Sequence, residues 1–178
     1  MLQNTIEYRI GSLLDVPEGH IIHGCNAQGV MGSGVALAVK TKYPLAYVAY
    51  QQHLKSFDDD GIAVGTNSYW KNPSTNLVIW NAVTQERYGA GPARYVSYDG
   101  IEGCLRRFQR WLARAGTPGW DKEVITPDLV GIPKVLNFPR IGCGLGGGDW
   151  NIIEAIIENT VDPSIKLICW DLPAPVRL

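Results

Sequence analysis

A glycine-rich stretch near the amino terminus has the residue types of an anion-binding loop. It runs from the apolar segment 21–23 through Asn26, Gly32, Ser33 and Gly34 into a segment with helical spacing. A helix amino terminus presents unpaired backbone amides and a positive dipole, and glycines let a phosphate approach them closely. The stretch lacks the third glycine of the dinucleotide fingerprint, and the chain has no glycine-lysine-serine/threonine triplet of a P-loop. Taken alone, it fits either an anion site or a tight turn.

A second glycine-rich stretch follows the apolar segment 135–138 and again precedes a helical pattern. Residues 142–148 hold five glycines in seven positions. Ordering so many glycines is costly in conformational entropy, so the stretch must have a use. Two such loops at the same edge of one sheet can close on a ligand from both sides. The pair therefore predicts a cleft between the loops.

The two histidines of the apolar segment give no sign of a metal site. His20 and His23 are three positions apart on an extended segment, so their side chains point to opposite faces. His23 could act as an acid or base, but a hydrogen-bonded core histidine fits its place on a buried strand better. We expect no metal and no cofactor.

Short apolar runs alternate with helical patterns along the chain. Strands are expected at 6–10, 21–23, 77–83, 135–138 and 167–170. Helical spacing occurs at 37–42, 47–57, 101–112 and 152–157. This order predicts an α/β fold in which helices cover both faces of a mixed or largely parallel sheet, with ligands beyond the carboxyl ends of the strands. Residues 116–133, rich in proline and glycine, are expected to form an irregular surface insertion.

The bulk composition narrows the class of protein. A length of 178 residues with 46% hydrophobic content fits one domain over residues 1–178. A net charge of -1 and the absence of a lysine or arginine run argue against a nucleic-acid binder. No apolar run approaches the roughly 20 residues of a membrane span. The four cysteines form no CxxC pair and no leader-like segment is recognisable, so we expect reduced cysteines in a cytoplasmic protein.

The two loops together resemble those of the macro domains. Residues 26–36, Asn-Ala-Gln-Gly-Val-Met-Gly-Ser-Gly-Val-Ala, are similar to the family's first ligand loop, and residues 139–150, Pro-Arg-Ile-Gly-Cys-Gly-Leu-Gly-Gly-Gly-Asp-Trp, to its second. The resemblance is strongest to the branch that holds ADP-ribose 1''-phosphate phosphatases, terminal ADP-ribose glycohydrolases and related bacterial and phage proteins. It implies a three-layer α/β/α fold with a central mixed, largely parallel sheet, and ADP-ribose or a close derivative as the ligand.

The resemblance also implies which residues meet ADP-ribose. Asn26 would hydrogen-bond the distal ribose, since its amide both donates and accepts. Gly32, Ser33, Gly34 and Val35 would face the distal ribose and phosphates, and Ile141, Gly142, Cys143, Gly144, Leu145 and Gly146 would hold the diphosphate. Many family members bind adenine through an aspartate where this chain has Ser12. Here the adenine would meet Ser12 or the amide of Leu13, with an apolar wall from Leu13 and from Trp170 or Leu172. Trp170 fits a core position at least as well.

The catalytic groups of the glycohydrolase branch are missing. Its attacking lysine and assisting aspartate correspond to Gln85 and Gly146, which can do neither task. The groups that could orient a water against a phosphomonoester are Asn26, Gln85 and Asp149, besides His23 and the Ser33 hydroxyl. Asp149 stands equally well where a helix cap is expected.

Three functions therefore remain open. The first is a phosphatase acting on ADP-ribose 1''-phosphate. The second is a reader of ADP-ribose or of ADP-ribosylated macromolecules, and the third is a water-based ADP-ribosyl hydrolase. A nucleic acid is expected as a partner only if it is ADP-ribosylated, and the protein is expected to be a monomer. Residues 87–95 form either a lid over the distal ribose or a plain surface loop.

Overall fold

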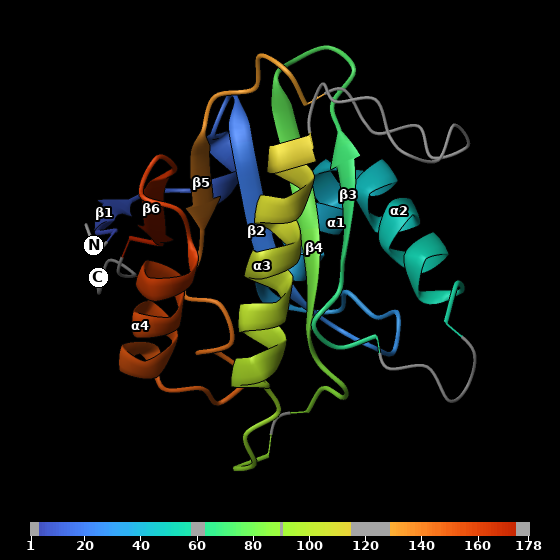
Figure 1. The fold of residues 1–178 in the computed structure, drawn as a ribbon. Helices are drawn as coiled ribbons and strands as arrows, with labels where there is room; N and C mark the ends of the chain where they lie inside the picture. The colour runs from blue at the N-terminus through green and yellow to red at the C-terminus, as the bar shows by residue number, and fades with distance from the viewer. Residues whose placement is uncertain (1–3, 58–62, 90, 115–128, 174–178) are drawn as a thin grey trace, which may run out of the picture.

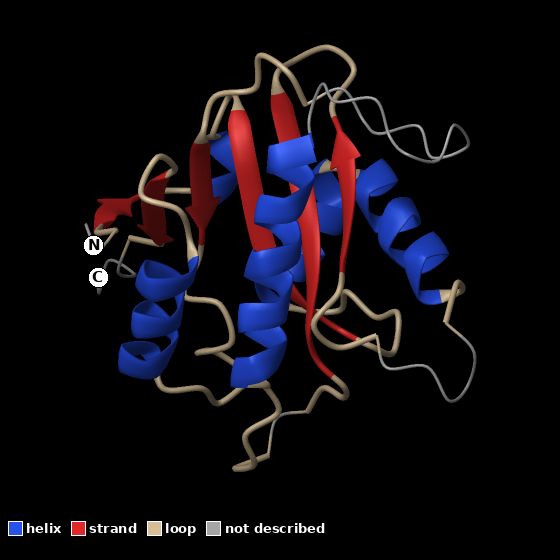
Figure 2. Ribbon diagram, in the orientation of Figure 1, coloured by secondary structure: helices blue, strands red, loops and turns tan. Residues whose placement is uncertain are grey.

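In the computed structural model, which describes residues 4–57, 63–89, 91–114 and 129–173, six strands form one sheet. The strands are β1 (Ile6–Ile10), β2 (Gly19–Asn26), β3 (Asn67–Lys71), β4 (Leu77–Gln85), β5 (Val135–Phe138) and β6 (Lys166–Asp171). The helices of this part are η1 (Leu13–Asp15, a short 3-10 turn), α1 (Gly34–Lys42), α2 (Pro44–Leu54), α3 (Tyr98–Arg114) and α4 (Trp150–Thr160). Figure 1 labels these elements, and Figure 2 separates strands from helices by colour.

The sheet is mixed and largely parallel, as the sequence predicted. Its strand order is β1-β6-β5-β2-β4-β3. Every neighbouring pair is parallel except β3 with β4, which is antiparallel. The carboxyl ends of the parallel strands β2, β4 and β5 therefore meet at one edge of the sheet, where both glycine loops begin.

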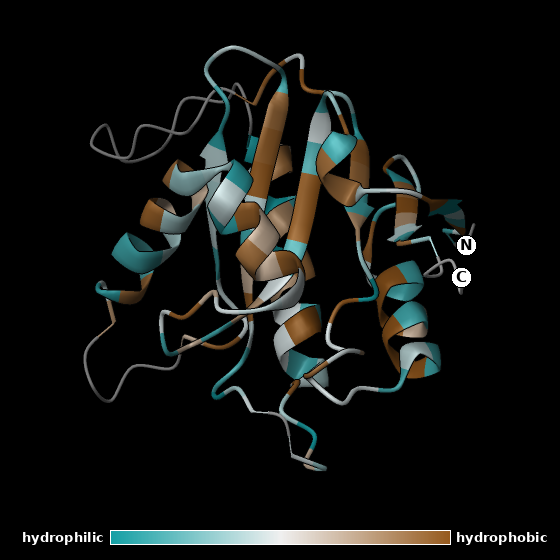
Figure 3. Cartoon of the chain, turned by 180° about the vertical axis from the view of Figure 1, so that it is seen from behind, coloured by the Kyte–Doolittle hydropathy of each residue, from teal (hydrophilic) through white to brown (hydrophobic). Residues whose placement is uncertain are grey.

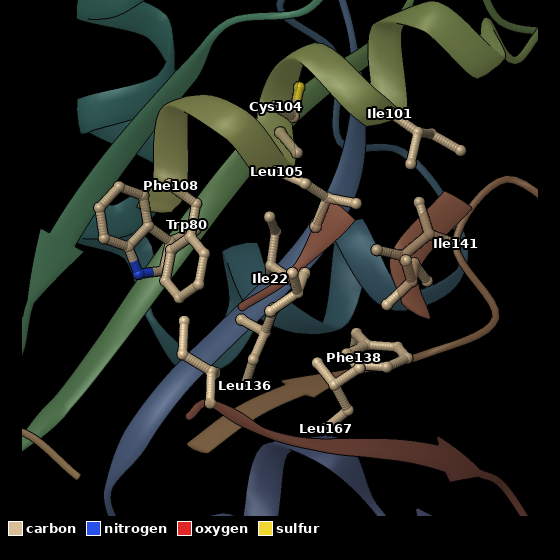
Figure 4. Close-up of a cluster of buried hydrophobic side chains, with 14 of the residues drawn as sticks. Ile22, Trp80, Ile101, Cys104, Leu105, Phe108, Leu136, Phe138, Ile141 and Leu167 are labelled. Carbon is tan, nitrogen blue, oxygen red and sulfur yellow. The ribbon is translucent and has the colours of Figure 1, made fainter. Parts of the chain in front are cut away.

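Helices cover both faces because side chains along the central strands alternate between them. Ile22 and Trp80 point toward α3 and α4, where they join a cluster with Phe108. Figure 4 shows this cluster in close-up. Ile21 and Ile79 point to the opposite face, covered by α1 and α2. Figure 1 shows α3 and α4 in front of the sheet, and in the reversed view of Figure 3 the central strands are mainly coloured as hydrophobic.

The structure differs from the expected elements in a few places. Strand β3 was not predicted, and helix α2 ends at Leu54 rather than near residue 57. Ile152 is 44% exposed, so the buried face of α4 rests on other isoleucines. Residues 116–128 of the expected insertion lie outside the described residues. Its last part is not wholly on the surface, because Leu129 and Ile132 are buried in the main core.

Both histidines of β2 are buried and point to opposite faces, as predicted. The His20 ring packs edge-on against Phe108, and its Nδ1 accepts a hydrogen bond from Trp80 Nε1 at 3.1 Å. His23 Nε2 lies 2.9 Å from Asn81 Oδ1 on the other face. His23 is thus a hydrogen-bonded core histidine. Within the described ranges, no helix has the length and apolar character needed to cross a bilayer.

Candidate ligand pocket

A pocket of about 580 Å³ opens where β2, β4 and β5 end. Its walls come from the first glycine loop, from the residues after β4 and from the second glycine loop. The lining residues are Gly24, Cys25, Asn26, Val30, Gly32, Ser33, Gly34, Val35, Ala36, Gln85, Tyr88, Gly89, Pro139, Arg140, Ile141, Gly142, Gly144, Leu145 and Gly146. The two glycine-rich stretches, far apart in the sequence, therefore face one shared space.

The first loop presents the amino terminus of α1 to this pocket. Ser33 is the cap residue, and its hydroxyl makes no capping hydrogen bond. The first hydrogen bond of the helix runs from Leu37 N to Ser33 O, which leaves the amides of Gly34, Val35 and Ala36 without a partner among the described residues. Unpaired amides at a helix start favour a negative charge. This wall of the pocket is therefore suited to a phosphate.

The second loop adds further unpaired amides from the opposite side. It is held in shape by backbone bonds from Gly147 N to Gly144 O (3.1 Å) and from Gly148 N to Gly142 O (2.8 Å). The amides of Gly144, Leu145 and Gly146 donate to no group in the described part of the chain. A Cβ at Gly144 would meet nothing within 4 Å, so the protein itself does not need a glycine there. Gly144 itself lines the pocket, where a ligand could reach the loop amides.

Among the described residues that line the pocket, Arg140 is the one that is permanently charged. Its guanidinium donates to both carboxylate oxygens of Asp171, each at 2.8 Å, and lies near the rings of Tyr8 and Trp150. Arg140 holds the pKa of the Asp171 carboxyl below its usual value. No carboxylate, histidine or lysine lines this pocket in the described residues. Its affinity for anions must therefore come mainly from backbone amides.

Asn26 lines the pocket, but much of its side chain is already engaged within the first loop. Its Nδ2 donates to Val30 O at 2.7 Å, and its Oδ1 accepts from Gln28 N at 2.9 Å and from Val30 N at 3.3 Å. One N–H of the amide remains for a ligand. Gln85 also lines the pocket, and its Nε2 donates to Arg87 O at 2.7 Å.

The structure brings together most of the residues expected around the distal ribose and diphosphate. The expected residues in the pocket wall are Asn26, Gly32, Ser33, Gly34, Val35, Gln85, Ile141, Gly142, Gly144, Leu145 and Gly146. Their contact with ADP-ribose stays a prediction.

The residues expected around the adenine do not line this pocket. Ser12 Oγ accepts from Leu14 N at 3.2 Å and so caps the 3-10 turn, while Leu13 is buried beneath it. Trp170 is half-buried, and its Nε1 donates to Asn137 Oδ1 at 2.9 Å. Leu172 is exposed. These residues lie at the same sheet edge but beyond the pocket wall.

Two further candidates have structural tasks. Asp149 Oδ1 accepts from Asn151 N at 2.9 Å, which makes Asp149 the cap of α4, and it does not line the pocket. The Cys143 thiol donates to Ile141 O at 3.6 Å and also lies outside the lining. A catalytic role for Asp149 would require its carboxylate to come closer to the pocket.

Sequence reasoning missed several pocket residues, chiefly Arg140 and Tyr88. Arg140 lies in the second glycine-rich stretch, residues 139–150. Tyr88 lies in the segment 87–95, for which the sequence allowed either a lid or a surface loop. That segment packs on the second loop, since Tyr95 N and Val96 N both donate to Gly146 O, at 2.9 and 3.1 Å. Tyr88 and Gly89 belong to the pocket wall. The segment is thus more than a plain surface loop in its described part.

Comparison with known proteins gives the family. Residues 22–157 match the Macro domain family. An ADP-ribose 1''-phosphate phosphatase of Aspergillus clavatus is 47% identical over 178 residues, covering 84% of this chain and 86% of that protein. Among solved structures, the macrodomain of Mycobacterium tuberculosis DarG has a TM-score of 0.68 at 22% identity, covering 96% of this chain and 99% of that one. Thermosipho africanus DarTG in complex with ADP-ribose has a TM-score of 0.67 at 24% identity, covering 99% of this chain and 43% of that one. With its fold, its two glycine loops and these matches, the chain belongs to the macro domain family.

Proposed function

We propose that this macro domain binds ADP-ribose between its two glycine loops and hydrolyses ADP-ribose 1''-phosphate to ADP-ribose. The observation that carries the proposal is the pair of unpaired amide sets, Gly34 to Ala36 and Gly144 to Gly146, on opposite walls of one pocket. Two such sets suit a ligand with more than one anionic group. The 47% identity to an ADP-ribose 1''-phosphate phosphatase supports the same substrate.

The reaction would rest on positioning and on amide dipoles. A water oxygen forms the new bond to phosphorus, the bond from phosphorus to the ribose oxygen breaks, and the ribose oxygen takes up the proton that the attacking water releases. Loop amides would stabilise the charge on the phosphoryl oxygens as the bond breaks. The polar side chains of the described pocket wall that could orient the water are those of Asn26, Ser33, Gln85, Tyr88 and Arg140.

A non-catalytic reader of ADP-ribose is the second candidate. It is favoured by the composition of the pocket wall, in which no carboxylate, histidine or lysine of the described residues could serve as a general acid or base. Lysine-dependent removal of ADP-ribose is not proposed, because Gln85 and Gly146 occupy the positions that correspond to the catalytic pair.

Calorimetry and a phosphate-release assay separate these functions. ADP-ribose should bind and raise the melting temperature by mass action, and AMP should do so more weakly because it lacks the distal ribose and the second phosphate. Phosphate release from ADP-ribose 1''-phosphate would establish the phosphatase. Tight binding without release would favour the reader, and equal binding of AMP and ADP-ribose would contradict the assignment of the loops.

A matched variant tests whether the second loop is the binding element. Gly144→Glu places a carboxylate into the open space beside the free amides, with no protein atom within 4 Å of its Cβ. We expect a folded protein that no longer binds ADP-ribose, because the carboxylate repels the diphosphate and occupies its place. A folded variant with unchanged affinity would count against the loop.

We also propose that the protein works in the cytoplasm. All four cysteines are free, and reduced cysteines are usual in a reducing compartment. Labelling of the thiols in intact cells would test this, since disulfide-linked cysteines would point to an oxidising compartment.

A further inference from the structure

The first glycine loop is held from behind by helix α2. Tyr50, on α2, is fully buried, and its hydroxyl donates to the backbone oxygen of Asn26. The same hydroxyl lies 3.1 Å from Asn26 Oδ1. It therefore touches both hydrogen-bonding oxygens of the residue at which β2 ends and the loop begins.

A second tyrosine holds the loop three residues further on. Tyr47 lies one helical turn before Tyr50, on the same side of α2. Its hydroxyl donates to Gly29 O at 3.1 Å and accepts from Gln51 Nε2 at 2.7 Å. Gly29 has a φ of +76°, which favours glycine. The loop is thus bound to the helix at Asn26 and again at its left-handed turn.

The residue held by Tyr50 in turn engages two backbone amides of the loop. Asn26 Oδ1 lies beside the Tyr50 hydroxyl and accepts hydrogen bonds from the backbone amides of Gln28 and Val30. Those two amides are thereby turned inward. Further along, the amides of Gly34, Val35 and Ala36 donate to no other described residue and lie at the pocket. Asn26 acts here as the centre of a folded turn as well as a wall of the pocket.

We infer that Tyr50 is a positioning residue, which fixes Asn26 and so preorganises the first glycine loop for its ligand. Tyr50 is not among the residues that line the pocket, and it belongs to the buried cluster with Cys25, Met31 and Val83. The inference deepens the proposed function and rests on it for the identity of the ligand. Without the hydroxyl, the loop would have to be ordered during binding, and that cost would weaken affinity.

The decisive variant is Tyr50→Phe, which removes one oxygen and keeps the ring in its cluster. We expect ADP-ribose to bind roughly 10-fold more weakly, the size expected for losing one hydrogen bond to a buried acceptor. Hydrogen exchange of the Gln28 and Val30 amides should become faster without any ligand present, because both donate to Asn26 Oδ1. Exchange at the centre of β2 should not change.

Two control variants separate positioning from general loss of stability. Tyr43→Phe removes a hydroxyl that also donates to a backbone oxygen, Leu14 O at 3.3 Å, but away from the pocket. Ile157→Val weakens the core under α4, on the other face of the sheet. Neither should alter exchange in the loop or affinity for ADP-ribose. Tyr47→Phe releases Gly29 O in the loop and Gln51 Nε2 on α2. It should act like Tyr50→Phe with a smaller effect, and it replaces that variant if Tyr50→Phe is poorly folded.

The inference is overturned if Tyr50→Phe binds ADP-ribose as the unmodified protein does, or if loop exchange rises equally in Ile157→Val. If the unmodified protein does not bind ADP-ribose, the proposed function fails. The exchange measurement needs no ligand and would still decide whether Tyr50 orders the loop.

Discussion

The two glycines at the start of the second loop should respond very differently to the same small change. Gly142 has a φ of +75°, and a Cβ there would lie 2.6 Å from Val96 Cγ2. Gly144 has neither constraint, since nothing lies within 4 Å of its added Cβ. Replacing each glycine by alanine therefore compares two positions of one loop. At Gly142 the added methyl group costs stability through backbone strain and a clash, and at Gly144 it enters open space.

For Gly142→Ala, two penalties add. The left-handed conformation costs a residue with a Cβ roughly 1–2 kcal/mol, and forcing a methyl group against Val96 costs about 1–3 kcal/mol. A loss of about 3 kcal/mol in the free energy of unfolding would lower the melting temperature of a domain of this size by about 6–12 °C. Gly144→Ala should leave the melting temperature within about 2 °C of the unmodified protein, since an exposed position without strain rarely matters more.

Thermal and urea unfolding of both variants, without ligand, provide the test. Affinity for ADP-ribose should not follow stability. Gly144→Ala should be as stable as the unmodified protein but should bind ADP-ribose more weakly, because its methyl group narrows the approach to the free amides. Equal melting temperatures for the two variants would refute the conformation assigned to Gly142. A strongly destabilised Gly144→Ala would refute the open space beside residue 144.

Three further predictions concern pH and the helix cap. Burial lowers the pKa of His20 and of His23 to about 4 from 6.5. Because the folded state holds the neutral rings, their contribution to stability is complete above pH 6.5 and is lost as pH falls toward 4. Urea unfolding should show a loss of about 2 kcal/mol for each histidine between pH 6.5 and 5, and a flat profile would contradict their burial. Asp149→Ala should cost about 1 kcal/mol in unfolding free energy as a lost helix cap and leave phosphate release unchanged; a large fall in turnover at equal stability would restore Asp149 to catalysis. If phosphate is released, kcat/KM should stay level from about pH 7 to 8.5, because no carboxylate, histidine or lysine of the described residues lines the pocket. A bell-shaped profile in that range would require an acid and a base from elsewhere.

The fold could be predicted largely from local pattern. Strands β1 and β5 were expected at the bounds they have. Strand β5 is a short, largely apolar run typical of a buried strand, whereas β1 buries only Ile6. Strand β3 was missed since its sequence, Asn-Ser-Tyr-Trp-Lys, has no apolar run. Its polar residues are buried through distant partners: Asn67 Nδ2 donates to Cys104 O, and Ser68 Oγ accepts from Asn81 Nδ2. Such partners cannot be recognised from the strand itself.

The two loops could also be recognised from the sequence, because clustered glycines are costly and mark close approach of a ligand to the backbone. The roles of individual polar residues could not be recognised from the sequence. Asp149 caps a helix, the amide of Asn26 folds its own loop, and Arg140 is paired with Asp171 across the sheet edge. In the helical pattern of residues 47–57, Tyr50 falls at a position typical of an ordinary core residue, so nothing in the sequence indicated its contact with Asn26. Residue types and order determined that this chain would form an α/β sheet with two glycine-rich loops at the carboxyl ends of its strands. Which side chains remain free to meet a ligand was decided only by tertiary structure, since a donor or acceptor is available only when no group distant in sequence has already paired with it.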